Sequence, residues 1–113
     1  MLSKLFDVLR GRNIDVYYIG QHIGGCESPY VVLKDDGEQE VTGCSMNRNL
    51  IDVLIYCPQG IFDKVIPYAG EIKEILSEVK EIRDTRYRSP VIIDSDKKAY
   101  TTTLRYINYK SIR

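Results

Sequence analysis

The sequence has no tryptophan, only one histidine, and no apolar run that approaches the length of a membrane-spanning helix. Such a helix needs about 20 consecutive apolar residues, so we expect none here. The single histidine, His22, lies in a glycine-rich segment without an evident acidic partner nearby in sequence, which disfavours Ser-His-Asp and Cys-His catalysis. The chain also lacks net charge, because 16 basic residues balance 16 acidic ones. Affinity for duplex nucleic acid comes largely from neutralised phosphates, so this balance argues against that function.

Cysteine is scarce as well. Cys26, Cys44 and Cys57 are an odd number, widely spaced, and form no Cys-x-x-Cys pair. Together with His22 they could in principle make a Cys₃His zinc site, but the spacing favours reduced thiols that pack as small apolar groups. The segment 20–25 (GQHIGG) follows neither the phosphate-binding nor the dinucleotide-binding pattern, so it indicates a loop. We therefore predict no metal ion and no cofactor.

The composition is that of an ordinary folded domain. Hydrophobic residues make up 43% and charged residues 28% of 113 residues, a length that suits one modest core and not two. The charges are unevenly distributed, however. Residues 1–60 carry five basic and eight acidic side chains, whereas residues 61–113 carry eleven and eight. Opposite charges in the two halves of a neutral chain are suited to self-association, in which an acidic patch of one subunit meets a basic patch of the next.

The first half of the chain predicts a short helix followed by strands. Apolar residues at positions 2, 5, 6 and 9 form one helical stripe, and Gly11 suits the helix end. This basic N-terminal stretch lacks an apolar core and a cleavage site, so we expect structure there and not a targeting signal. Residues 14–19, 30–34 and 50–57 are rich in β-branched, aromatic or other apolar side chains and predict strands. Asp35, Asp36 and Gly37 predict a turn that leads to a hairpin partner over 39–46.

The second half predicts a longer amphipathic helix followed by two strands. Apolar residues recur every three or four positions from Val65 to Ile82, and Pro67 suits the first turn of the regular helix. We expect a polar, basic loop over 83–88, a short strand over 90–93 and a long strand over 99–109. Neither face of that last strand is plainly polar, so it is either central in a sheet or covered by another subunit. The order predicts a single α+β domain over 1–113, with a mainly antiparallel sheet, a short N-terminal helix and one longer helix packed on it.

One short sequence motif suggests an enzymatic alternative, a metal-dependent nuclease. Asp94, Asp96 and Lys98 form a D-x-D-x-K run at a strand end, and the order of elements resembles the restriction-endonuclease-like family of metal-dependent nucleases. Paired carboxylates that hold Mg²⁺ are chemically reasonable in such a site. In that family the acidic and lysine residues precede the second helix, whereas here they follow it, and the third strand offers Asp52 without a lysine. Turn chemistry explains the same Asp-rich run.

The whole-chain pattern resembles the tail terminator proteins of long-tailed bacteriophages and prophages, also called tail-completion or tail-to-head joining proteins. Four segments read together carry the resemblance. They are LSKLFDVL near the N-terminus, the strand and break NLIDVLIYCPQG, the amphipathic stretch IKEILSEVKEI, and the near-terminal AYTTTLRYINYKSIR. The resemblance covers nearly the full chain.

The resemblance implies a structural role without catalysis. Proteins of this family form a homo-oligomeric ring, commonly a hexamer, which caps the tail tube, stops its polymerisation and joins tail to head. The implied partners are the tail tube protein and a head connector, at the tail-head junction of a virion assembled in the host cytoplasm. Neither a membrane nor specific nucleic-acid binding is implied. The candidate contact residues for subunits or partners are Asp35, Asp36, Glu38, Glu40, Arg83, Arg86, Arg88, Arg105, Tyr106 and Tyr109.

Overall fold

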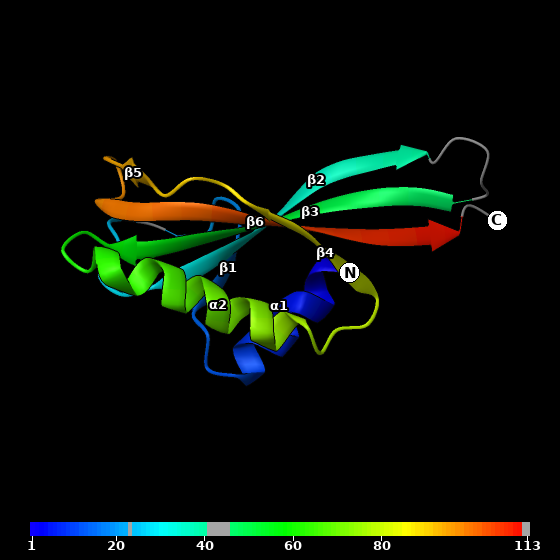
Figure 1. Cartoon of the computed structure of the whole chain (residues 1–113), viewed down its shortest axis with the longest axis horizontal. Helices are drawn as coiled ribbons and strands as arrows, with labels where there is room; N and C mark the ends of the chain where they lie inside the picture. The colour runs from blue at the N-terminus through cyan, green and yellow to red at the C-terminus, as the bar shows by residue number, and fades with distance from the viewer. Residues whose placement is uncertain (23, 41–45, 112–113) are drawn as a thin grey trace.

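A twisted six-stranded sheet with helices on one face organises the chain (Figure 1). The computed structural model describes residues 1–22, 24–40 and 46–111, except for the side chains of 39–40, 46–47 and 109–111. The elements in chain order are α1 (Leu2–Gly11), β1 (Val16–Tyr18), β2 (Tyr30–Glu40), β3 (Met46–Pro58), the 3₁₀ turn η1 (Phe62–Lys64), α2 (Val65–Leu76), β4 (Ile82–Arg88), β5 (Ile92–Asp94) and β6 (Ala99–Ser111). The predicted α+β class, the mainly antiparallel sheet and the two helices are confirmed.

The sheet has the strand order β1-β2-β3-β6-β4, and β5 also pairs with β6. The pairs β2–β3, β3–β6 and β6–β4 are antiparallel, whereas β1 runs parallel to β2. β6 is thus central, which is the first of the two alternatives that its mixed faces allowed. β3 lies beside it, so the most apolar strand and the tyrosine- and threonine-rich strand form the middle of the sheet.

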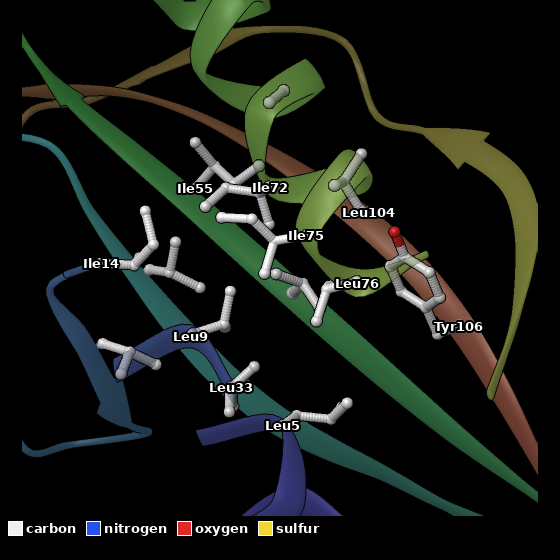
Figure 2. Close-up of a cluster of buried hydrophobic side chains, with 14 of the residues drawn as sticks. Leu5, Leu9, Ile14, Leu33, Ile55, Ile72, Ile75, Leu76, Leu104 and Tyr106 are labelled. Atoms are coloured by element: carbon white, nitrogen blue, oxygen red, sulfur yellow. The ribbon is translucent and has the colours of Figure 1, made fainter. Parts of the chain in front are cut away.

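The core lies between the helices and one face of the sheet. Leu5 and Leu9, one helical turn apart on α1, are fully buried, and Ile72 and Leu76 repeat this spacing on α2. Alternate residues of the strands, such as Ile55 and Leu104, meet them from the sheet (Figure 2). Side chains of a helix recur on one face every three to four residues and those of a strand every two, so both patterns supply one continuous apolar cluster.

Three strands extend beyond the helices. In Figure 1 the distal ends of β2, β3 and β6 run past α1 as a three-stranded projection, and the molecule measures 48 × 26 × 24 Å. We call this projection the arm and define it as residues 36–40, 46–50 and 107–111. Pairs such as Glu38 with Asn49 and Leu50 with Ile107 hold it together. Neither helix covers the arm in this view.

The predicted turn at residues 35–37 is wrong. β2 continues through it to Glu40, and the register with β3 shifts between Asp35 and Glu38, which marks a β-bulge. The Asp35 carboxylate accepts hydrogen bonds from the Gly37 amide (2.8 Å) and from Asn49 Nδ2 (3.0 Å). These bonds stabilise a local kink without reversing the chain. Of the predicted partner strand 39–46, residues 41–45 lie outside the described residues.

Two further boundaries differ from the prediction. The segment 83–88 is not a loop, because it pairs with β6 as β4. Its many charges are compatible with an edge strand, where one side of the backbone faces solvent. The second helix ends at Leu76 and not at Ile82. Val79 is buried all the same, since the turn after the helix packs against the core, and this burial prolongs the apolar periodicity beyond the helix.

Candidate functional site

The sheet face opposite the helices carries apolar side chains, several of which are only half-buried. Strand alternation places Val32 of β2, Leu50 and Leu54 of β3 and Ile107 of β6 on this face, because their neighbours Leu33, Ile51, Val53 and Tyr106 belong to the core. Leu50, Leu54 and Ile107 are half-buried, whereas Val32 is buried in a small cluster with Tyr30. We call these four residues with Tyr56 the open face. An antiparallel sheet can expose one face to water, but such faces are usually polar.

A cluster of rings covers one end of the open face. His22 stacks on Tyr30 at 3.9 Å between ring centroids, and Tyr30 stacks on Tyr56 at 4.8 Å. Tyr17 meets both His22 and Tyr30 edge-on. Burial raises the pKa of Tyr30, whose hydroxyl has no hydrogen-bond partner among the described residues. The rings border a shallow hollow of about 230 Å³ that Lys97 also lines.

The loop that carries His22 is held in place by Lys97. Its ammonium donates to the His22 carbonyl (3.3 Å), and its own carbonyl accepts from the Cys26 amide (2.7 Å). These contacts explain the position of the glycine-rich loop without a ligand. The loop therefore serves, on this geometry, as the cover of a second small apolar cluster around Tyr30, Val32 and Ala99.

Arg105 joins four strands on the same face of the sheet. Its Nε donates to Asp52 Oδ1 at 2.9 Å, and its Nη2 lies 3.5 Å from Asp36 Oδ2. The guanidinium also lies over the ring of Tyr87, 5.3 Å from the centroid. The hydrogen bond to Asp52 is the main cause of a raised Arg105 pKa. Two predicted contact residues, Arg105 and Asp36, are thus brought together within one chain.

The other predicted acidic residues lie along one edge of the sheet. Asp35 is exposed but has a structural role in the bulge, and Glu38 is exposed next to it. The backbone of Glu40 closes β2 opposite Asn47, while its side chain lies outside the described residues. The acidic residues therefore follow the distal part of β2, which forms one margin of the arm.

The predicted basic residues other than Arg105 lie on β4. Arg83, Arg86 and Arg88 are exposed. Arg86 has a φ of 63°, and its amide donates to Asp84 Oδ1 at 2.7 Å, which accommodates a bulge between Asp84 and Arg88. Lys73 of α2 lies 3.7 Å from the other Asp84 oxygen and offsets its charge. The outer edge of β4 is therefore predominantly basic.

The structure describes the side chain of only one of the two predicted tyrosine contacts. Tyr106 is 2% exposed and packs in the core between the sheet and α2, so it is not part of an exposed surface (Figure 2). Tyr106 was predicted to contact another subunit or partner, but the residues that bury it belong to its own chain. Tyr109 lies in β6 opposite Arg48, and its side chain is outside the described residues.

Asp94 acts as a turn cap. Its Oδ1 accepts hydrogen bonds from the amides of Asp96 (3.1 Å) and Lys97 (3.2 Å).

Burial raises the pKa values of the Cys26 and Cys57 thiols to about 11, and both are free cysteines. Cys44 lies outside the described residues. Across 1–22, 24–40 and 46–111, no group of three or more His, Cys, Asp or Glu side chains is placed to hold a metal ion.

Two residues of this site, Asp52 and Tyr87, were not among the predicted contact residues. Asp52 is 6% exposed, and Tyr87 contacts Arg105 from the edge strand. A lone carboxylate within the apolar run 50–57 was the available signal for Asp52, because a buried charge requires a partner. No local pattern marked Tyr87.

Neither the known protein families nor the curated protein sequences include a match to this chain. In the described part, no helix has the length and apolarity of a membrane-crossing segment.

Proposed function

We propose that this protein is a structural subunit of the tail-terminator type, which self-assembles into a ring at the end of a phage tail tube and joins the tail to the head. The observation that carries the proposal is the open face. Leu50, Leu54 and Ile107 lie half-buried on a sheet face that neither helix covers. Half-buried apolar groups in such a position favour a protein partner, because their further burial removes apolar surface from water.

The elongated shape of the molecule supports a role in protein assembly more than one in small-molecule catalysis. The arm projects past the helices (Figure 1), and its apolar residues Leu50 and Ile107 are half-buried. The charged groups around Asp36, Asp52 and Arg105 are occupied by one another, which suits a rigid scaffold. A ring requires a head-to-tail contact between two different surfaces of each subunit, and an elongated subunit with an uncovered sheet provides room for both.

The first test is the mass of the purified protein by light scattering coupled to size-exclusion chromatography. We expect a multiple of 13.0 kDa. Replacing Leu50 and Ile107 by Ser should weaken association by about tenfold or more, since each change removes apolar surface from the open face. Ile66→Ser, on the exposed side of α2, is the matched control and should leave the mass unchanged. A protein that stays at 13.0 kDa at all concentrations would contradict the proposal.

The second test concerns the tail. Negative-stain electron microscopy of purified tail tubes mixed with the protein should show a density at one tube end, and tubes polymerised in its presence should be shorter. Tubes that grow unchanged, without added density, would exclude the terminator function. Mg²⁺-dependent DNA cleavage that is lost in Asp96→Ala would instead favour the nuclease alternative.

A further inference from the structure

An exposed aromatic ring lies at the end of the molecule away from the arm. Phe62 of η1 is 56% exposed. Its ring meets Tyr100 edge-on, with 5.0 Å between the centroids, and Tyr100 pairs with Ile93, whose side chain is also exposed. β5 and the start of β6, which carry Ile93 and Tyr100, lie opposite the arm in Figure 1. We call Phe62, Ile93 and Tyr100 the end patch.

The Phe62 ring has a support within its own chain. Tyr100 packs against the core cluster, so the edge-on contact holds Phe62 on one side and leaves the rest of the ring exposed. A side chain that is already ordered loses less conformational entropy when a partner binds. Aromatic rings bury large areas and dominate the energetics of interfaces. Phe62 is therefore suited to anchor a protein contact.

The hollow beside the ring stack has the size for such an anchor. Its volume is about 230 Å³, and its lining includes Ile19, Leu54, Tyr56 and Lys97. Ile19 is exposed, and Leu54 and Tyr56 are half-buried. An apolar cavity of about 150 Å³ accommodates one benzene molecule, so this hollow has room for a phenyl ring. We call it the ring hollow.

Phe62 cannot fill the ring hollow of its own chain. Tyr100, which supports Phe62, pairs with Cys57 and belongs to the cluster on the helix side of the sheet. Leu54 and Tyr56 belong to the cluster on the other side, because side chains alternate along a strand. The anchor and the hollow thus lie on opposite faces of one sheet. A contact between them joins two molecules through different surfaces.

The charges beside the anchor and the hollow are complementary. Asp63, next to Phe62, is exposed and has no ion pair within 1–22, 24–40 and 46–111. The Lys97 ammonium donates to the His22 carbonyl, and no carboxylate in the described part of the chain forms an ion pair with it. An Asp63 carboxylate from a second molecule balances this charge. Lys64 is placed differently, since it lines a separate hollow together with Glu71.

We propose that the Phe62 ring of one copy inserts into the ring hollow of the next, so that the end patch of each subunit docks on the open face of its neighbour. This proposal rests on the proposed ring and names the surface that meets the open face, which shares Leu54 and Tyr56 with the ring hollow. Each subunit contributes an anchor and a hollow from different surfaces. The interface is therefore heterologous and closes into a ring if the rotation per subunit allows. The occupant of the hollow is a second copy of this chain.

Two variants that each lack one half of the contact test this pairing. Phe62→Ser removes the anchor, and Leu54→Trp fills the hollow. Each variant alone should stay at 13.0 kDa at concentrations where the unmodified chain assembles. An equimolar mixture offers one intact anchor and one intact hollow, so it should form a heterodimer and grow no further. Sedimentation velocity and light scattering measure these masses.

Ile66→Ser is the matched control, because Ile66 is a comparably exposed apolar residue one helical turn after Phe62 and takes no part in the insertion. It should assemble like the unmodified chain. Ile19→Arg is a second hollow variant for the case that Leu54→Trp does not fold. It changes an exposed residue of the lining and places a charge where the inserted ring would have to desolvate it.

The outcomes separate this pairing from the ring itself. If the unmodified chain and Phe62→Ser assemble equally well, the pairing is wrong while the ring proposal stands. A mixture of the two variants that stays monomeric, or that regains the full assembled mass, also overturns the pairing. If Phe62→Ser assembles normally but no longer binds tail tubes, the anchor contacts the tube protein and not a second copy. An unmodified chain that is always monomeric overturns both proposals.

Discussion

Arg105 of β6 and Asp52 of β3 are directly paired on adjacent strands, and Arg105 Nε lies 2.9 Å from Asp52 Oδ1. Asp52 is largely buried, whereas the Arg105 side chain keeps 37% exposure. Truncating the arginine leaves a buried carboxylate without its main partner. Arg105→Ala should therefore lower the free energy of unfolding by about 1–3 kcal/mol. Urea denaturation followed by circular dichroism measures this loss, and Lys80→Ala should stay within about 0.5 kcal/mol. Equal effects of both changes would show that the ion pair contributes nothing.

Two glycines offer a paired test with opposite signs. Gly37 in the β2 bulge has a φ of 101°, a conformation that L side chains rarely adopt, so Gly37→Ala should destabilise by about 1–2 kcal/mol. Gly70 lies in α2, and a methyl group added to it would meet no neighbouring atom within 4 Å, so Gly70→Ala should stabilise by about 0.5–1 kcal/mol. Thermal and urea unfolding of the two variants give the comparison. A neutral Gly37→Ala would mean that the bulge tolerates a different backbone.

The buried thiols predict a loss of stability at alkaline pH. Burial raises the pKa values of Cys26 and Cys57 from 9.0 to about 11, so the unfolded chain releases these protons first. Their contribution to stability is fully present below about pH 9 and declines as pH rises toward 11. The free energy of unfolding, measured by urea at intervals from about pH 8 to about pH 10.5, should fall. The double variant Cys26→Ala with Cys57→Ala should show a shallower decline, and an identical slope would contradict the assignment.

The helix-sheet core predicts large effects from single truncations. Leu9 on α1 and Ile72 on α2 are both fully buried, so Leu9→Ala and Ile72→Ala should each cost about 2–5 kcal/mol. Ile66→Ala, on the exposed side of α2, is the control and should change stability little. Denaturation midpoints of the three variants rank them. A small loss at Leu9 would indicate that α1 is only loosely attached to the sheet.

The periodic elements could be predicted because their signals are local. The stripe of Leu5 and Leu9 and the repeats around Ile72 predicted both helices, and the apolar run 50–57 predicted the strand that became β3. The two mixed faces of β6 left a central position and cover by another subunit open, and the strand order shows that β6 is central. Burial of an element on one or both sides imposes a spacing of apolar residues that is visible in the sequence.

The errors arose where tertiary contacts override local preference. Asp35, Asp36 and Gly37 have the composition of a turn, but Asn49 on the neighbouring strand fixes them as a bulge. The 83–88 segment resembles a loop until its backbone pairs with β6. Arg105 and Asp36 were assigned to different surfaces, and only the strand order brings them together. Such pairings join residues far apart in the chain, which no local window of sequence can reveal.

The position of β6 also has a consequence for synthesis. β6 is the last strand in the chain order, yet it lies between β3 and β4 and pairs with β5 as well. Until β6 has been synthesised, β3 lacks one of its two neighbours and β4 has no strand to pair with. Folding must then wait for contacts between distant parts of the chain, which are slow to form, and the nascent chain exposes an apolar strand edge in the interval.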